Sequence, residues 1–211
     1  MISPAFLSEP DQTLVADASV AINLNAAGCA RALVGALQHR LVITDIAAAE
    51  LRMDRRNGRD DAALLMELVE GQLLEIVSLD GPALDIFERL VVGSAGETLE
   101  DGEAASIAYA VQNRACCLTD DRKAQLIGSQ RFPDLRIAST MDLFSDRRAS
   151  IALGADVLSE SIFLAMRDAR MRVPANKVDW VISLIGHDRA RQCPSLPRTV
   201  RERTEMAAEA T

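Results

Sequence analysis

Acidic residues stand at the ends of short apolar segments in the first 121 residues of this 211-residue sequence. Asp17 ends the segment TLVAD, Asp120 and Asp121 follow ACCLT, and Glu50 and Glu103 lie in the helix-like segments IAAAEL and GEAASIAYA. Carboxylates that converge in a partly buried crevice repel one another and raise one another's pKa unless cations neutralise them. The set therefore predicts a site for a hard divalent cation, Mg²⁺ or Mn²⁺, which prefers oxygen ligands.

Such a site suits the hydrolysis of phosphodiesters. A bound metal ion lowers the pKa of a water molecule, and a pair of ions stabilises both the attacking and the leaving oxygen. Other chemistries lack their residues, because His39 and His187 have no metal-ligand spacing and the four cysteines include no CxxC pair. The sequence also has no GxGxxG or GxxxxGK[ST] loop, so we expect no organic cofactor.

Helices and strands must position these acids. The sequence alternates short apolar segments with longer segments of helical periodicity, which is typical of a parallel sheet. Strands are expected at 13–17, 41–44, 73–77, 115–119 and 135–138, and helices at 20–38 with a break at Gly28, 46–55, 62–70, 82–92, 103–113 and 122–129. Ligands of such sheets bind at the carboxyl ends of the strands. The acids stand at or near those ends, so we expect them to meet there.

The strand pattern stops after Met141. Two further helices are expected, one over 156–170 and one that begins at Pro174, a residue favoured at helix starts. We therefore expect an α/β domain over 1–148 and a helical hairpin over 149–186 packed on it. The segment 187–211 is polar and holds two prolines, which predicts a tail that is loose or ordered by a partner.

Composition places the chain among globular proteins with an aliphatic core. Apolar residues make up 49% of the chain and aromatic residues 3%, which argues against RNA recognition on stacked aromatic rings. The net charge of −8 is uneven, because residues 1–121 carry 8 basic and 20 acidic side chains and residues 122–211 carry 15 and 11. The cysteine pattern favours a reducing compartment, and the chain shows no signal-like start and no long apolar run, so we expect a cytoplasmic protein without a membrane segment.

The acidic segments resemble those of the PIN domain nucleases, in the VapC-like toxin branch. The matching pieces are LVADAS with Asp17 and Ser19, AAAEL with Glu50, GEAASIAYA with Glu103, and LTDDRKA with Thr119, Asp120 and Asp121. They occur in the family's order over residues 13–145. The resemblance implies an α/β fold of the PIN type, with three α/β/α layers, a central five-stranded parallel sheet and a C-terminal helical hairpin.

The resemblance also implies which acids are catalytic. Asp17, Glu103 and Asp121 would hold the metal, and Glu50 would complete the catalytic set directly or through water. Most VapC sequences have Asp where this chain has the longer Glu103, so Asp101, two residues upstream, is an alternative metal ligand.

Other residues of these segments would support the site. Asp120 is an alternative metal ligand to the aspartate that follows it, and Ser19 and Thr119 would support the metal site through hydrogen bonds. Each acid taken alone could equally be a helix cap or a turn residue.

Basic residues follow two of the acids. Arg122 and Lys123 come directly after Asp121, and Arg52 follows Glu50, so these side chains are expected to contact RNA phosphates. A solvated helix surface is the alternative for Arg52.

These observations favour a metal-dependent endoribonuclease that cuts RNA, the toxin of a toxin–antitoxin pair. The resemblance implies a homodimer and an antitoxin protein that covers the acidic crevice. Two alternatives are open. One is a non-catalytic PIN-like module that binds RNA or protein, favoured if Glu103 lies away from the other acids. The other is a small-molecule phosphoesterase, which the absence of a phosphate-binding glycine loop argues against.

Overall fold

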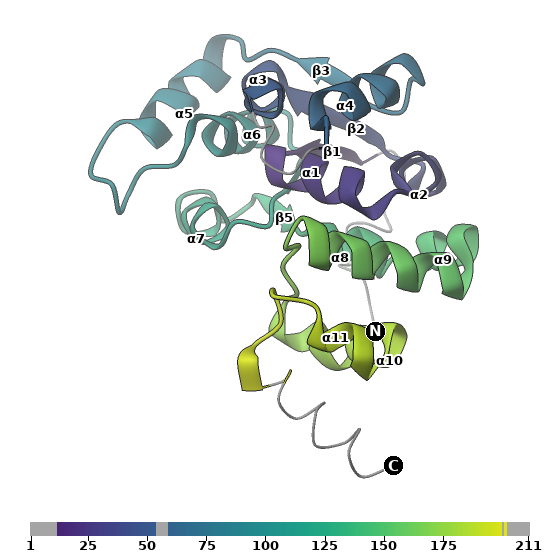
Figure 1. The fold of residues 1–211 in the computed structure, drawn as a ribbon. Coiled ribbons are helices and arrows are strands. Elements are labelled where there is room, and N and C mark those ends of the chain that lie inside the picture. The colour runs from purple at the N-terminus through teal and green to yellow at the C-terminus, as the bar shows by residue number, and fades with distance from the viewer. Residues whose placement is uncertain (1–11, 54–58, 200, 202–211) are drawn as a thin grey trace. The chain divides into compact units, whose positions relative to one another are not determined.

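A five-stranded parallel sheet lies at the centre of the fold (Figure 1). The computed structural model describes residues 12–53, 59–199 and 201. The strands are β1 (Thr13–Ala16), β2 (Arg40–Thr44), β3 (Glu75–Val77), β4 (Cys116–Leu118) and β5 (Arg136–Ala138), in the order β3-β2-β1-β4-β5. All five lie where the sequence predicts them. With helices flanking the sheet, the expected three-layer α/β/α fold is confirmed.

The strand order places the carboxyl ends of β1 and β4 side by side. From β1 the chain adds β2 and β3 on one side and then returns to add β4 and β5 on the other, so the order reverses between β1 and β4. Val15 pairs with Val42 of β2 and with Cys117 of β4. Such a reversal is where open α/β sheets bind ligands, because the connections leave their carboxyl ends in opposite directions.

Helices occupy most of the remaining described residues, and the chain divides into two compact units. The helices are α1 (Ala18–Ala27), α2 (Ala30–Leu37), α3 (Asp45–Met53), α4 (Asp61–Glu70), α5 (Gly81–Val91), α6 (Asp101–Gln112), α7 (Arg122–Arg131), α8 (Thr140–Phe144), α9 (Arg147–Asp168), the short 3₁₀ helix η2 (Ala175–Lys177), α10 (Val178–Ile185) and α11 (His187–Arg191). Of the described residues, 12–22 and 38–140 form a sheet unit, and 23–37 and 141–201 form a helical unit. The expected break at Gly28 is confirmed, where a φ of 69° separates α1 from α2.

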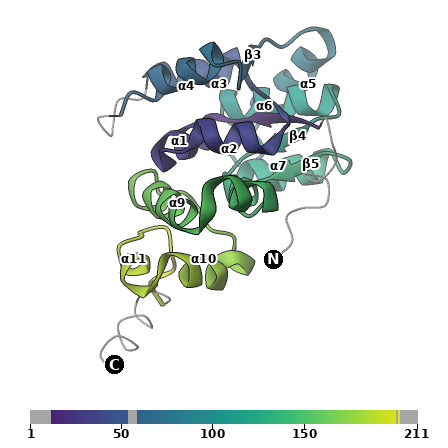
Figure 2. The same ribbon diagram turned by 90° about the vertical axis from the view of Figure 1, so that its right-hand side faces the viewer.

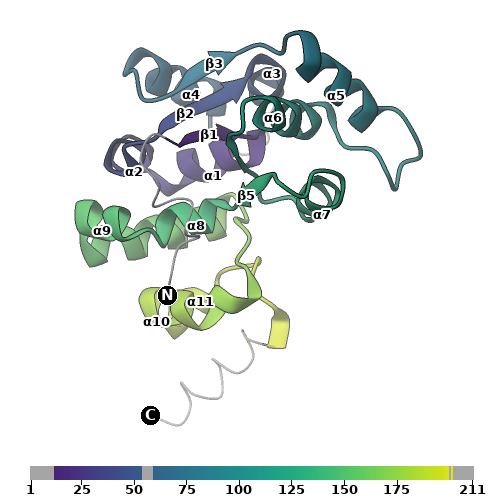
Figure 3. The same ribbon diagram turned by 180° about the vertical axis from the view of Figure 1, so that it is seen from behind.

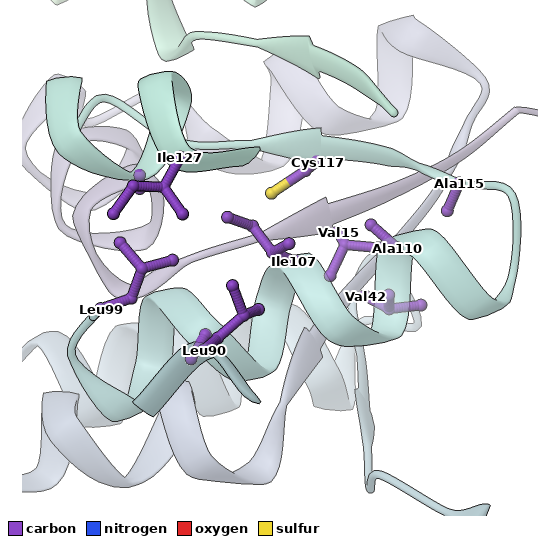
Figure 4. Packing of buried hydrophobic residues seen from close by; sticks show 11 residues of the cluster. Val15, Val42, Leu90, Leu99, Ile107, Ala110, Ala115, Cys117 and Ile127 are labelled. Atoms are coloured by element: carbon purple, nitrogen blue, oxygen red, sulfur yellow. The ribbon is translucent and has the colours of Figure 1, made fainter. Parts of the chain in front are cut away.

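The core of the sheet unit fixes α6 against the strands (Figure 4). Val15 and Cys117 of the sheet meet Ile107 of α6, with Leu90 of α5 and Ile127 of α7 beside them. Figure 3 shows α5, α6 and α7 from behind the view of Figure 1. Most of α6 is buried, and its many alanines allow the helix to approach the sheet closely. The first turn of α6 is therefore held in place by packing along the rest of the helix.

In the helical unit, α2 and α10 both contact α9, and α11 follows α10 (Figure 2). Arg148 ties two of these helices together, because its guanidinium donates a hydrogen bond to the carbonyl oxygen of Leu37 at 2.6 Å. Lys177 is buried and donates to Oδ1 of Asp142 and to Oγ of Ser145, each at 2.5 Å. The three arginines Arg167, Arg189 and Arg191 pair with Asp168, Glu160 and Asp188 respectively.

Three features of the helical unit differ from the sequence expectation. Helix α9 begins at Arg147 rather than at Asp156, because Asp146 caps it by accepting a hydrogen bond from the backbone N–H of Arg148. Helix α8 was not expected, and α11 lies within the segment predicted as a polar tail. The part of that tail over 202–211, and residue 200, lie outside the described residues.

One described helix, α9, is long and apolar enough to cross a membrane by length and composition. Of that stretch, 44% is buried inside the structure. Gly154 interrupts the helix with a φ of 73° and a ψ of 166°. Neither regular part then reaches the ~20 residues that a membrane-spanning helix needs.

Candidate active site

Asp17 follows β1 directly and is almost completely buried, with 2% of its surface exposed. Its Oδ1 accepts hydrogen bonds from the hydroxyl of Ser19 at 2.7 Å and from the backbone N–H of Val20 at 2.9 Å. The carboxylate therefore caps the amino end of α1. Burial raises the pKa of Asp17 to about 6, although hydrogen bonds from Thr119, Ser19 and Val20 act in the opposite direction.

Asp121 stands at the matching position after β4. Its Oδ1 accepts a hydrogen bond from the backbone N–H of Ala124 at 2.8 Å, which caps α7. The backbone N–H of Asp121 donates to the hydroxyl of Thr119 at 3.2 Å, and the Thr119 side chain also hydrogen-bonds Asp17. Thr119 thus connects the acids that end the two neighbouring strands, and Ser19 adds a second connection by accepting a hydrogen bond from the N–H of Asp120.

Glu103 approaches these two acids from the first turn of α6. Burial raises its pKa to about 7, and the negative charges of Asp121 and Asp17 add to the shift. The charges of the acids that follow β1 and β4 thus both act on Glu103. Further along α6, the hydroxyl of Ser106 donates to the carbonyl oxygen of Gly102 at 2.9 Å and lies 3.4 Å from that of Ala16.

Glu50 of α3 lies against the same turn of α6. Its Oε1 accepts a hydrogen bond from the backbone N–H of Gly102 at 2.8 Å. Burial raises the pKa of Glu50, the Gly102 N–H lowers it, and the negative charges of Glu100 and Asp101 raise it further. The charges that act on Glu50 are therefore those at the start of α6.

The acids share one local role, because three of them bind the amino end of a helix: Asp17 at α1, Glu50 at α6 and Asp121 at α7. Free N–H groups and the helix dipole favour negative charge at these ends. Burial still raises the pKa of Asp17 and of Glu103, and nearby negative charge adds to both shifts, from Asp120 at Asp17 and from Asp121, Asp17 and Glu100 at Glu103.

The two alternative ligands lie differently. Both oxygens of Asp120 accept hydrogen bonds from Thr140, at 3.0 Å from its N–H and 2.5 Å from its hydroxyl. Asp101 is exposed in the first turn of α6. The charge of Asp120 also acts on Asp17 and raises its pKa, whereas the charges of Asp121 and Asp17 act on Glu103.

The basic residues beside the acids also differ in their surroundings. Arg122 is exposed at the start of α7, next to Asp121. Lys123 donates a hydrogen bond to the carbonyl oxygen of Ala95 at 2.7 Å, in the loop between α5 and α6. Arg52 belongs to α3, but its side chain lies outside the part of the chain that the structure describes.

The donor set fits a hard divalent cation in its chemistry. It consists of carboxylates and hydroxyls, and the raised pKa of Asp17 and of Glu103 marks negative charge that a cation would relieve. Within residues 12–53, 59–199 and 201, no three His, Cys, Asp or Glu side chains stand close enough together to hold a metal ion. The carboxylates would therefore have to move inward to bind one jointly.

A cavity of about 650 Å³ lies at the other ends of the strands, where β4 and β5 begin. Arg114, Arg131, Phe132 and Arg136 are among its lining residues. Arg131 already donates to two backbone carbonyl oxygens and Arg136 to the side chain of Gln12. The carboxyl ends of α6 and α7 meet here, and their dipoles disfavour an anion.

Two contacting residues were missed in the sequence analysis, Gly102 and Thr140. The glycine of the segment GEAAS stands before Glu103, and an added Cβ at Gly102 would lie 2.5 Å from Oε1 of Glu50. A glycine inside a helical pattern is the feature that would have singled it out, because glycine costs helix stability. No local sequence signal points to Thr140, since its contact with Asp120 spans 20 positions of the chain.

Comparison with known proteins gives one family and one solved structure. The family model DUF3368, described as a PIN domain, matches residues 13–187. A chain in the crystal structure of VapBC2 from Rickettsia felis bound to a DNA fragment from their promoter is similar to this chain, with 14% sequence identity and a TM-score of 0.43, over 61% of this chain and 98% of that chain. No curated protein matches.

Proposed function

The chain belongs to the PIN domain family DUF3368, and from this membership we propose that it is a metal-dependent endoribonuclease. PIN domains are generally nucleases. The acidic site and the sequence resemblance support RNA as the substrate and Mg²⁺ or Mn²⁺ as the cofactor.

A single observation carries the proposal. Glu103, whose pKa is raised to about 7, lies under the electrostatic influence of Asp121 and Asp17 at the reversal point of the sheet. A cation bound at this ligand-binding edge of the sheet would relieve the repulsion that Asp121 and Asp17 exert on Glu103. The same coupling argues against the non-catalytic alternative, which would be favoured if Glu103 lay away from the other acids.

Asp17, Glu103 and Asp121 are the residues that would hold the metal. When bound, a divalent ion supplies a water of lowered pKa and stabilises negative charge on the phosphate oxygens. Oδ1 of Asp17 and Oδ1 of Asp121 are engaged by helix N–H groups. These bonds fix the orientation of each carboxylate.

The neighbouring residues have positioning roles in this proposal. Ser19 and Thr119 hold Asp17 through their hydroxyls, and Arg122, exposed beside Asp121, would contact a phosphate of the RNA. Lys123 acts on the loop before α6, because its Nζ is bonded to Ala95.

The experiment compares cleavage of a panel of structured RNAs by the purified protein and by Asp17→Asn, in Mg²⁺, in Mn²⁺ and in EDTA. Asp85→Asn, an exposed aspartate of α5, serves as the matched control. We expect metal-dependent cleavage by the wild type and the control, and at least a ~100-fold loss in Asp17→Asn, since removal of a group that stabilises transition-state charge costs about that much.

Each other outcome is informative. Folded wild type that neither cleaves RNA nor binds Mn²⁺ would identify a non-catalytic module. Cleavage of a small phosphodiester such as bis(p-nitrophenyl) phosphate, without cleavage of RNA, would identify a phosphoesterase. Cleavage that survives Asp17→Asn would place the active site elsewhere.

The biological setting is part of the proposal. The resemblance to VapC-like toxins suggests a cytoplasmic homodimer whose antitoxin partner covers the acidic site. The domain division into 1–148, 149–186 and 187–211 is proposed from the sequence pattern, in which strand signals stop after Met141. Growth arrest on expression of the wild type, and none on expression of Asp17→Asn, would support the toxin assignment.

A further inference from the structure

We propose that Glu50 is a positioning residue that caps α6 from a different helix, and that Gly102 is required to let its carboxylate reach the cap. Through this contact Glu50 would hold Glu103 in the acidic site without itself binding the metal. The inference rests on the proposed nuclease function for its catalytic meaning, but the contact itself can be tested without any activity.

The amino end of α6 needs partners from outside its own cap residue. The first N–H groups of a helix have no partner within the helix. Glu100 stands at the N-cap, and its side chain makes no capping hydrogen bond. The Glu103 side chain instead accepts a hydrogen bond from the backbone N–H of Glu100, and the Gly102 N–H donates to Oε1 of Glu50 at 2.8 Å. Glu50 therefore supplies from α3 a bond that caps normally supply locally.

Glycine is the only residue type at position 102 that leaves room for the Glu50 carboxylate. A Cβ at position 102 would lie 2.5 Å from Oε1, 2.6 Å from Cδ and 2.6 Å from Oε2 of Glu50. Such distances are far inside van der Waals contact, so any side chain would displace the whole carboxylate. Glycine in a helix costs about 1 kcal/mol relative to alanine. Close approach of Glu50, rather than an unusual backbone angle, accounts for a glycine here.

The charges around Glu50 agree with this role. Those that act on its carboxylate come from Glu100 and Asp101, at the start of α6, whereas those that act on Glu103 include Asp121 and Asp17. Glu103 follows Gly102 directly in the chain. A shift of the Gly102 backbone would therefore move Glu103 relative to the acids that end β1 and β4.

The first measurement is hydrogen exchange of the Gly102 amide in the metal-free protein, by NMR. Glu50→Gln keeps an acceptor oxygen at the same place and loses the charge, whereas Glu50→Ala loses both. We expect exchange of this amide to rise about tenfold or more in Glu50→Ala, as expected for loss of a hydrogen bond to a charged group. In Glu50→Gln it should rise much less. Asp101→Asn, which changes a neighbouring charge, is the control.

The second measurement is calorimetric titration with Mn²⁺. Loss of an outer partner of a metal site costs about 10–100-fold in affinity. We expect a loss in that range for Glu50→Ala and for Gly102→Ala, and near-complete rescue in Glu50→Gln. Gly96→Ala, in a loop where an added Cβ meets nothing within 4 Å, should bind as the wild type does. Glu50→Ala combined with Gly102→Ala should lose no more than either single variant, because both remove the same contact.

The outcomes separate the inference from the proposed function. Equal loss of Mn²⁺ affinity in Glu50→Gln and Glu50→Ala, with Gly102 exchange unchanged in both, would make Glu50 a direct ligand and overturn the inference. Protected Gly102 exchange that depends on Glu50, in a protein that neither binds Mn²⁺ nor cuts RNA, would uphold the cap and reject the nuclease. Wild-type affinity in Gly102→Ala would also overturn the requirement for glycine.

Discussion

Asp120 binds Thr140 through both of its carboxylate oxygens. Oδ1 accepts a hydrogen bond from the Thr140 N–H at 3.0 Å, and Oδ2 accepts one from the Thr140 hydroxyl at 2.5 Å. Asp120 thereby fixes the single residue Thr140, whereas its neighbour Asp121 caps α7 with one oxygen. Adjacent aspartates of identical chemistry thus have different hydrogen-bond partners.

This separation predicts different effects of the same substitution at the two positions. Asp121→Asn keeps a capping oxygen, because Asn is a good N-cap, but loses a charge from the acidic site. We expect it to lower Mn²⁺ affinity by about tenfold or more, with little change in the thermal midpoint. Asp120→Asn should leave Mn²⁺ affinity close to that of the wild type. Equal losses in the two variants, measured by calorimetry, would contradict the assignment.

The stability of the metal-free protein should fall as pH rises through the raised pKa of Asp17. The folded carboxyl has a pKa of about 6 against 3.8 for the ordinary group, so between these values the folded state holds a proton that the unfolded state has released. Protonation thus favours folding, and this contribution is lost above pH 6. Asp17→Asn removes the penalty and should be more stable than the wild type by up to about 3 kcal/mol at pH 8. Near pH 4 the two should differ little.

Urea denaturation in EDTA from pH 4 to pH 8 tests this expectation. Asn retains one acceptor oxygen, and the hydroxyls of Ser19 and Thr119 can accept from its amide, so the local hydrogen bonds survive. A stability difference between the two proteins that does not change with pH would show that Asp17 is not penalised by burial.

Divalent metal should stabilise the wild type and not the variant that lacks Asp17. A ligand that binds only the folded state at about 100 times its dissociation constant stabilises by about 2.7 kcal/mol. We expect Mn²⁺ to raise the thermal midpoint by several degrees, EDTA to reverse the change, and Asp17→Asn to show neither effect. An equal rise in both proteins would indicate that the metal binds at another place.

Lys177 and Asp142 should stabilise the helical unit only as a pair. Lys177 is 3% exposed, and its Nζ lies 2.5 Å from Oδ1 of Asp142. Loss of one partner of a buried ion pair costs about 3–5 kcal/mol, because the other charge stays buried without compensation. Asp142→Ala should therefore lower the free energy of unfolding by roughly that amount, and the combined Asp142→Ala and Lys177→Met variant should recover part of the loss. A change below 1 kcal/mol in Asp142→Ala, measured by urea denaturation, would show that the pair is dispensable.

Local sequence patterns were sufficient to predict the sheet. Each strand is a short apolar segment bounded by turn residues or helix starts, as in TLVA of β1 and CCL of β4. The break at Gly28 followed from the backbone freedom of glycine. Patterns failed where the determinant was a single cap or kink: Asp146 starts α9 earlier than expected, and Gly154 disturbs its periodicity without ending it.

The sequence by itself determined which acids exist, on which elements they stand and that those elements end at one edge of a parallel sheet. Only the tertiary structure decided their partners: that Asp120 binds Thr140, and that Glu50 caps α6 across 52 positions of the chain. The reason is physical. Strand and helix formation depend on the side chains of neighbouring residues, whereas the direction of a carboxylate depends on hydrogen-bond donors brought near it by packing of distant segments.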